Sequence, residues 1–252
     1  MIEFFDANVV VGRPQNGSVF EIVPDGPALC SHLDEKGIAR ALLMHWGQAE
    51  CNPLVSNALV DEAVAASERL FGCWAVLPPL TDPMITDDFF PRMKQARAAA
   101  LCLMPKAHRY VLDPIVWRGF MDEVCERRIP VVLTMGQQVE WDALYRFLRE
   151  MPTLTCILRN IGIWSMDRYT YPLLDAYENV HVETSMLAVE DGGVEEMAKT
   201  FGAERVLFGT GFPAQYVEAA MLQLVHADLA EAARTAIASG NLERLIAGAD
   251  YE

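Results

Sequence analysis

Short apolar and β-branched runs recur about every thirty residues along the chain, and the segments between them place apolar residues at three- and four-residue steps. The runs predict buried strands, and the intervening segments predict amphipathic helices. Alternation of the two is typical of successive βα units that build a parallel sheet. The eight predicted strands cover residues 2–11, 40–45, 70–77, 99–104, 130–135, 155–160, 180–185 and 205–210.

The helical pattern is clearest at residues 57–69, 113–127, 140–150 and 217–224. Two further helices are predicted at 228–239 and 241–248, where no strand follows, and we expect them to pack against an outer ring of helices. Eight strands, most of them followed by a helix, is the number that closes a (β/α)8 TIM barrel, whereas an open doubly wound sheet usually needs fewer strands. No linker-like stretch divides the chain, so residues 1–252 are predicted to form a single TIM-barrel domain.

The composition changes this picture mainly through charge. The chain has 252 residues, is 52% hydrophobic and carries a formal net charge of -15, so its field repels nucleic acid and anionic membranes. Its six cysteines are scattered without a C-x2-C pair, and no signal peptide or membrane-spanning run is evident. We therefore expect a cytoplasmic protein that takes a small-molecule ligand, with association into homo-oligomers left open.

Several common catalytic motifs do not occur in the sequence. There is no G-x-S-x-G elbow, no G-x-x-x-x-G-K-[ST] loop and no G-x-G-x-x-G fingerprint. The sequence therefore gives no support to a serine hydrolase of that type, a P-loop nucleotidase or a dinucleotide-binding enzyme.

Functional side chains of a TIM barrel project from the carboxyl ends of its strands. His45 ends the predicted second strand beside Trp46 and Gly47. An imidazole there could act as general acid or base at neutral pH, or it could be a hydrogen-bonded structural histidine. The residues predicted at strand ends are Asn8, His45, Lys106, His108, Thr134, Asn160, Glu183 and Gly211.

A compact basic cluster follows the predicted fourth strand of this acidic chain. Lys106, His108 and Arg109 could hold a substrate carboxylate, because arginine offers two-point hydrogen bonding and lysine a mobile charge. The alternative is a solvated loop whose charges pair with nearby acids. Arg159, within the predicted sixth strand, would add to an anion site if its side chain turns inward.

Glu183 is a carboxylate in the predicted seventh strand, next to apolar Val182. If it faces inward it could pair with Lys106 or act as a base with a raised pKa, since burial without a partner is costly. The other possibility is that it faces a helix.

Six local patterns, in order and at barrel spacing, give the chain a family resemblance. They are FDANVVVG at 5–12, LMPKAHRYVLD at 103–113, IPVVLT at 129–134, ILRNIG at 157–162, VLFGTGFP at 206–213 and GNLERL at 240–245. Together they resemble the amidohydrolase-related family of TIM-barrel metal-dependent hydrolases, the branch that also contains lactonases and non-oxidative decarboxylases of aromatic acids. The resemblance covers nearly the whole chain and implies the same fold.

The resemblance also implies a divalent metal held by two histidines of the first strand, a histidine from the fifth or sixth strand and an aspartate from the eighth. Asn8, Val10, Thr134, Asn160 and Gly211 stand at these positions here. A zinc-type site needs three or four strong donors, and activation of water near neutral pH depends on the charge of the cation. The sequence therefore predicts no metal and no other cofactor.

The first functional hypothesis is a metal-independent hydrolase or decarboxylase that acts on a small carboxylated organic molecule. Its predicted catalytic residues are His45 and Glu183. Its predicted substrate-binding residues are Lys106, His108 and Arg109 for the anionic group, with Asn8, Thr134 and Asn160 supplying neutral hydrogen bonds.

Two alternatives belong to other classes. A catalytically inactive barrel could serve as a binding or scaffold subunit, and it would have a mouth plugged by side chains such as Met135 or Trp164 and an apolar surface patch. A hydrolase with a relocated metal site, built from residues such as Asp6, His45 or Glu183, is the third possibility.

Overall fold

The structure is a computed structural model that describes residues 2–15, 19–81, 84–162, 165–189 and 191–252. Its eight parallel strands form one sheet in which each strand pairs with the next in chain order. Backbone hydrogen bonds close the sheet into a barrel, because the Ala7 N–H donates to the Phe208 carbonyl at 2.8 Å and the Gly211 N–H to the Asn8 carbonyl at 3.1 Å. The predicted (β/α)8 TIM barrel is confirmed.

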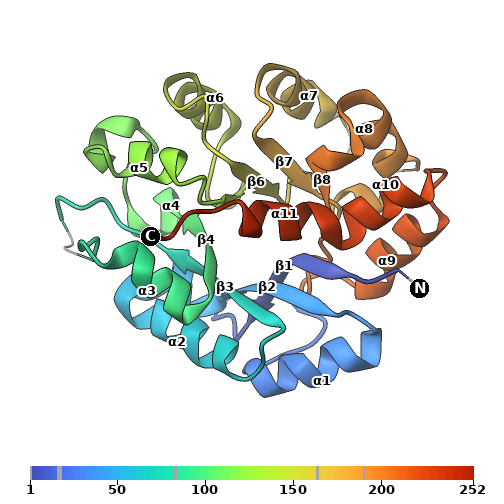
Figure 1. Cartoon of the computed structure of the whole chain (residues 1–252), viewed down its shortest axis with the longest axis horizontal. Coiled ribbons are helices and arrows are strands. Elements are labelled where there is room, and N and C mark those ends of the chain that lie inside the picture. The colour runs from blue at the N-terminus through green and yellow to red at the C-terminus, as the bar shows by residue number, and fades with distance from the viewer. Residues whose placement is uncertain (1, 16–18, 82–83, 163–164, 190) are drawn as a thin grey trace.

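The strands are β1 (Phe5–Val11), β2 (Arg40–His45), β3 (Leu70–Ala75), β4 (Ala98–Leu103), β5 (Val131–Thr134), β6 (Cys156–Arg159), β7 (Val180–Glu183) and β8 (Val206–Leu207). Helices surround them (Figure 1). The α-helices are α1 (Gly26–Lys36), α2 (Pro53–Ala65), α3 (Phe89–Ala96), α4 (Pro105–His108), α5 (Phe120–Glu126), α6 (Trp141–Glu150), α7 (Asp167–Ala176), α8 (Gly193–Phe201), α9 (Val217–His226), α10 (Glu231–Thr235) and α11 (Asn241–Ala247). Short turns of other helix types are η1 (Trp46–Ala49), η2 (Pro114–Trp117), η3 (Leu187–Val189), η4 (Ala203–Arg205) and the π-helix η5 (Ala236–Gly240).

The helix predicted over residues 113–127 is two elements, η2 and α5. Asp113 caps η2 by accepting a hydrogen bond from the Ile115 N–H at 3.0 Å. Arg118 and Gly119 then adopt left-handed backbone angles, with φ of 49° and 86°. A left-handed pair cannot continue a right-handed helix, so the chain breaks there and restarts at Phe120.

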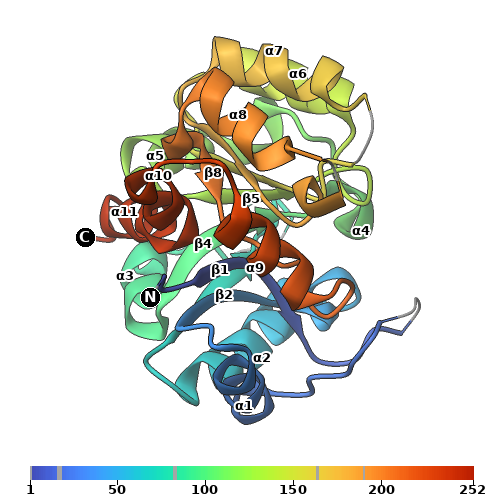
Figure 2. The same ribbon diagram turned by 90° about the vertical axis from the view of Figure 1, so that its right-hand side faces the viewer.

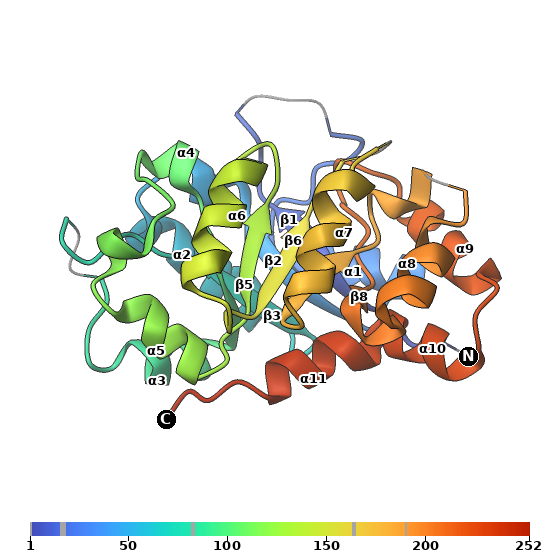
Figure 3. The ribbon, with the colours of Figure 1, turned by 90° about the horizontal axis from the view of Figure 1, so that it is seen from above.

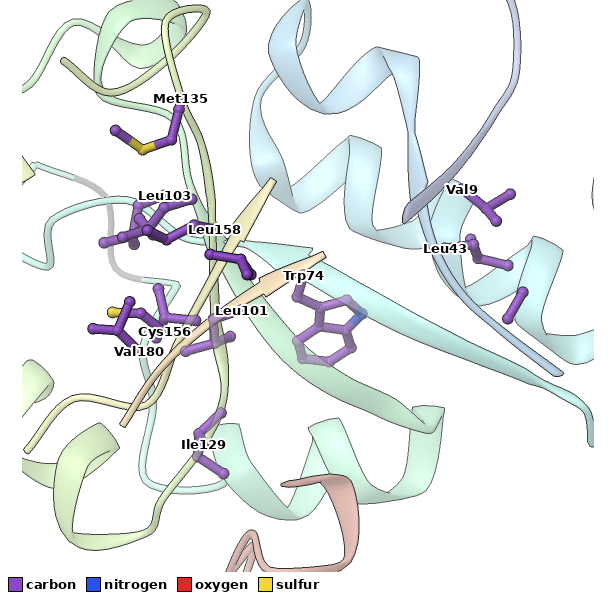
Figure 4. Packing of buried hydrophobic residues seen from close by; sticks show 14 of the residues in the cluster. Val9, Leu43, Trp74, Leu101, Leu103, Ile129, Met135, Cys156, Leu158 and Val180 are labelled. Carbon is purple, nitrogen blue, oxygen red and sulfur yellow. The ribbon is translucent and has the colours of Figure 1, made fainter. Parts of the chain in front are cut away.

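Strand alternation separates the buried apolar side chains into two layers. An inner layer fills the barrel and contains Phe5, Ala7, Val10, Leu42, Met44, Cys73, Ala75, Ala99, Ala100, Cys102, Met104, Val132, Ile157, Leu207 and Leu242. An outer layer packs between strands and helices, and Figure 4 shows members of it such as Leu101, Leu103 and Leu158. The face of a strand residue is therefore fixed by its position relative to these neighbours.

The prediction that both C-terminal helices join the outer ring is wrong for α11. This helix lies across the amino-terminal end of the barrel (Figures 1 and 2), and its Leu242 is 1% exposed within the inner layer. Leu245 and Ile246 pack against the same layer. The side chains of α11 therefore cover the inner layer at the amino-terminal end of the barrel.

The connection after β1 lies at the opposite end of the molecule from α11 (Figure 3). That end carries the carboxyl ends of the strands, where TIM barrels place their functional groups. Within the described parts of the chain, no helix combines the length and apolar character needed to cross a membrane.

Candidate functional site

A cavity of about 340 Å³, here called the mouth cavity, lies at the carboxyl ends of the strands. Its walls come from the ends of β1, β5 and β6 and from the segments that follow β2, β7 and β8. They are formed by Val10, Trp46, Met135, Gly136, Gln137, Arg159, Asn160, Met186, Gly211, Phe212, Pro213, Ala214 and Gln215.

Arg159 is the charged group in the wall of this cavity. It is two residues after Ile157 of the inner layer, so its side chain turns into the barrel, where it is only 7% exposed. Its Nη1 lies 2.7 Å from Sδ of Met44, a weak acceptor, and its buried Nε has no hydrogen-bond partner among the described residues. No carboxylate of the described residues lies within ion-pair distance of it, and burial lowers its pKa.

Glu183 ends β7 and also turns inward, with no exposed surface. Its Oε1 accepts hydrogen bonds from the Asn160 N–H at 3.0 Å and from the Ser185 hydroxyl at 2.8 Å. Its Oε2 accepts one from the Ser185 N–H at 2.8 Å. The partners of this carboxylate are therefore neutral donors at the ends of β6 and of β7 itself, and Lys106 is not among them.

Gly209 makes room for this carboxylate. A Cβ at position 209 would lie 2.4 Å from Oε2 of Glu183, so a side chain there would displace the buried acid. Close packing against Glu183 thus explains why a glycine stands at position 209, in the LFG sequence at the end of β8.

Asn8 and Ser185 join Glu183 in a buried polar network. The Asn8 amide donates to the Ser185 hydroxyl at 3.3 Å and to the Asn160 side-chain oxygen at 3.5 Å. Its own buried oxygen has no partner among the described residues. Thr134 is 7% exposed and pairs in register with Arg159, which places both side chains on the inner face. Of the predicted neutral groups, Asn160 lines the mouth cavity and contacts Asn8, whereas Asn8 and Thr134 are buried and do not line the cavity.

Asp6 is a second buried carboxylate, on the β8 side of β1. It accepts hydrogen bonds from the Asn8 N–H at 2.9 Å and from the N–H and hydroxyl of Thr210 at 3.0 and 2.5 Å. Burial raises its pKa to about 6, although the hydrogen bonds from Thr210 and Asn8 oppose that shift. Its partners show that it connects β1 to the segment after β8.

The side chains at the mouth do not fit a divalent cation of the zinc type. Among the residues that the structure describes, no group of three His, Cys, Asp or Glu side chains could hold a metal ion. Both oxygens of Glu183 already accept hydrogen bonds, and the amide of Asn8 and the hydroxyl of Thr134 are weak donors to zinc.

His45 is placed outside the mouth cavity. Met44 belongs to the inner layer, so the next side chain of β2 turns outward. His45 lines a different cavity, between α1 and α2, and its Nδ1 accepts a hydrogen bond from the Gly47 N–H at 3.0 Å. Burial lowers the pKa of this imidazole. In this position it caps η1 and cannot reach a molecule in the mouth.

The side chains of the basic cluster after β4 do not line the mouth cavity, although Lys106 contacts the backbone of its wall. The Lys106 ammonium donates to the Gly136 carbonyl at 2.8 Å and pairs with Glu140. His108 bonds through Nε2 to the Gln48 carbonyl at 2.7 Å, and Arg109 is exposed. His108 and Arg109 line another cavity, outside the barrel.

The structure thus brings Asn8, Asn160 and Glu183 together, places Thr134 on the inner face of β5, and leaves His45 and the basic cluster outside this network. Ser185 was missed by sequence reasoning, because a serine two residues after a strand carboxylate has no distinctive signal. The inward turn of Arg159 follows from alternation once Ile157 is known to face inward.

Among the residues that the structure describes, Met135 does not fill the mouth as a scaffold barrel would require. Met135 is 2% exposed and forms part of the cavity wall, yet the cavity of about 340 Å³ remains. Trp164, the other side chain expected to fill the mouth, lies outside the described residues.

Solved structures share this fold over nearly the whole chain. The 2,6-dihydroxybenzoate decarboxylase from Rhizobium has a TM-score of 0.73 and 16% sequence identity, with 98% of this chain and 99% of that chain covered. A variant of the 5-carboxyvanillate decarboxylase from Novosphingobium aromaticivorans, with bound manganese and 3-methoxy-4-hydroxy-5-nitrobenzoic acid, has a TM-score of 0.77 and 13% sequence identity. The match covers 98% of this chain and 97% of that chain. A probable 2-pyrone-4,6-dicarboxylic acid hydrolase from Acinetobacter baumannii has a TM-score of 0.69 and 13% sequence identity, and the match covers 98% of this chain and 100% of that chain.

At these identities the likeness to solved structures shows the fold alone. A comparison with curated proteins gives no significant match. The sequence profile of a family described as amidohydrolase matches residues 35–247, which is most of the chain. The protein therefore belongs to this amidohydrolase family.

Proposed function

We propose that the mouth cavity binds a small organic carboxylate with an apolar body, without the help of a divalent metal. The observation that carries this proposal is the buried guanidinium of Arg159, whose Nε has no partner in the described part of the chain. A buried cation that makes no direct ion pair is costly, although the charges of Glu183 and Asp6 favour its charged form. A ligand carboxylate would remove that cost by accepting two parallel hydrogen bonds from the guanidinium.

The walls of the cavity suit the rest of such a molecule. Val10, Trp46, Met135, Met186 and Phe212 supply apolar surface. Flat aromatic and thioether groups pack well against an aromatic ring. A cavity of about 340 Å³ is at the small end of the range for organic ligands. These features favour an aromatic acid with one ring.

The family relation supports the same class of ligand. The solved relatives include decarboxylases of 2,6-dihydroxybenzoate and 5-carboxyvanillate and a probable hydrolase of 2-pyrone-4,6-dicarboxylic acid. Each of these named compounds is an unsaturated ring that carries a carboxylate. In this chain the fixed positive charge of Arg159 would meet the carboxylate in place of a metal ion.

The test is calorimetric titration of the intact protein, in EDTA, with benzoate and 2,6-dihydroxybenzoate, and with benzamide as the uncharged control. We expect both acids to bind and benzamide to bind at least about tenfold more weakly, because it lacks the charge that the guanidinium needs. Arg159→Gln should remove this preference, while Arg159→Lys should retain part of it. Binding of the acids only after Mn²⁺ or Zn²⁺ is added would contradict the proposal.

Metal-independent turnover of the same molecule, by hydrolysis or decarboxylation, is the second candidate function. The observation that favours it is the 2.8 Å hydrogen bond from the Ser185 hydroxyl to Glu183, an arrangement in which a carboxylate can assist a hydroxyl nucleophile. The Asn8 amide, 3.3 Å from the same hydroxyl, could donate to a developing oxyanion. Both Ser185 and Glu183 have no exposed surface, which makes binding the better supported function.

Turnover is tested separately from binding. The protein is incubated in EDTA with 2,6-dihydroxybenzoate or 2-pyrone-4,6-dicarboxylate, and products are followed by chromatography. Ser185→Ala should remove hydrolysis of 2-pyrone-4,6-dicarboxylate, whose ring ester is the bond that a hydroxyl can attack, while retaining acid binding, because Arg159 is intact. Equal product formation by the wild type and this variant would contradict a role for the hydroxyl.

A further inference from the structure

A second and larger cavity lies outside the barrel, and we call it the lateral cavity. Its volume is about 720 Å³. Its walls are three segments: the turn between η1 and α2, the segment after β3, and the chain from α4 to just after η2. The lining residues used below are Cys51, Leu80, Arg109, Val111, Ile115 and Arg118.

Two arginines line this cavity without any partner in the described part of the chain. Neither Arg109 nor Arg118 makes a side-chain hydrogen bond or an ion pair there, whereas the neighbouring Lys106 pairs with Glu140. The cavity also contains Glu50, whose carboxylate accepts a hydrogen bond from the Gln15 N–H at 3.0 Å. Two cations and one anion give it a local positive excess in a chain of net charge -15.

Large apolar side chains surround these cations and are exposed to an unusual degree. Leu80 is 66% exposed, Val111 69% and Ile115 81%. Exposed apolar groups that gather in a concave site, rather than singly, mark a binding surface. An occupant that covers them must have an apolar body.

We propose that the lateral cavity binds a small amphipathic molecule with a single anionic group, which Arg109 and Arg118 hold while Leu80, Val111 and Ile115 cover its apolar body. One anionic group fits better than several, because the acidic protein repels a highly charged ligand. Paired guanidinium groups suit a carboxylate or sulfonate. This inference is independent of the function proposed for the mouth cavity.

The experiment is a fluorescence titration of the intact protein with 8-anilinonaphthalene-1-sulfonate. N-phenyl-1-naphthylamine, which has the same rings and lacks the sulfonate, is the uncharged control. The Arg109→Gln/Arg118→Gln variant should bind the sulfonate at least about tenfold more weakly and the uncharged dye with unchanged affinity. Both arginines are exposed, so the variant should fold, and its thermal unfolding is measured to check this.

A matched control removes the same charge elsewhere. Arg146 and Arg149 lie on the exposed side of α6, and changing both to Gln should leave sulfonate affinity within about twofold. Arg159→Gln should leave it unchanged as well. If Arg159→Gln weakens sulfonate binding and the lateral double variant does not, the dye occupies the mouth and the proposal is overturned.

Cys51 gives a readout specific to the lateral cavity. It is exposed and lines the cavity, so bound sulfonate should slow its alkylation by neutral iodoacetamide, measured by peptide mass spectrometry. Alkylation at the same rate with and without saturating dye would place the dye elsewhere and would overturn the proposal.

Discussion

The mouth cavity and the lateral cavity both contain arginine, but in opposite settings. Arg159 at the mouth is 7% exposed and sits among inner-layer side chains, whereas Arg109 and Arg118 are exposed on loops. A buried unpaired charge lowers stability, while an exposed one is solvated and costs little. Ligand binding would therefore explain why the mouth keeps a charge that lowers stability. At the lateral cavity, the evidence for a ligand is that charged and exposed apolar side chains occur together.

The short turn η1 contributes residues to the walls of both cavities. Trp46 at the start of η1 lines the mouth cavity, and Ala49 at its end lines the lateral cavity. Gln48 between them is buried and donates to the Cys73 carbonyl at 2.7 Å, and its own carbonyl bonds to His108. This turn is therefore fixed to the barrel on one side and to α4 on the other.

The largest difference between the regions should be seen in stability. Glu183→Ala leaves the Asn160 and Ser185 donors buried without their acceptor, and we expect the free energy of unfolding to fall by about 3 to 5 kcal/mol. Lys106→Ala removes an exposed ion pair and should cost less than about 1 kcal/mol. Urea unfolding measures both, and similar losses for the two variants would contradict the comparison.

The next effect is pH dependence from Asp6. The folded-state pKa is raised from 3.8 to about 6, so the folded protein binds more protons than the unfolded chain between these values. Stability contributed by this group is present below pH 4 and is lost as the pH rises through 6, by about 3 kcal/mol in all. Asp6→Asn should remove this fall in urea unfolding from pH 4 to 7.

The control for Asp6 is Asp25→Asn, at the exposed cap of α1. The unfolding free energy of this variant should change with pH as that of the wild type does between pH 4 and 7. If Asp6→Asn gives the same slope as the wild type, the buried carboxyl does not titrate as stated.

Arg159 should show opposite effects on stability and binding. Arg159→Met replaces a buried, unpaired cation with an apolar side chain, and we expect unfolding free energy to rise by about 1 to 3 kcal/mol while benzoate binding is lost. Arg109→Met should change stability by less than about 0.5 kcal/mol. A fall in stability for Arg159→Met would show that the guanidinium is already well paired.

The smallest effect concerns His45. Its Nδ1 caps η1 through the Gly47 N–H, so His45→Ala should cost about 1 kcal/mol of stability. Because the side chain turns away from the mouth, benzoate affinity should stay within about twofold. Loss of benzoate binding in this variant would restore the role predicted from the sequence.

Much of the fold was predictable because apolar periodicity repeats in every βα unit. The boundaries of the strands were less predictable. The strand β8 covers only Val206–Leu207 within a predicted run of six residues, because the glycines Gly209 and Gly211 that follow weaken the strand. The position of α11 could not be predicted either. Its apolar face could pack against the outer ring of helices or cover the open end of the barrel. The second position exists only once the barrel has assembled.

The sequence by itself determined the eight strands and the barrel that they form. It did so because periodicity and residue chemistry are local properties. Only the tertiary structure decided that Arg159 and Glu183 face the interior, that His45 faces away and that His108 and Arg109 line another cavity. The reason is geometric: neighbouring strand residues point to opposite faces, so a shift of one position exchanges barrel interior for outer surface.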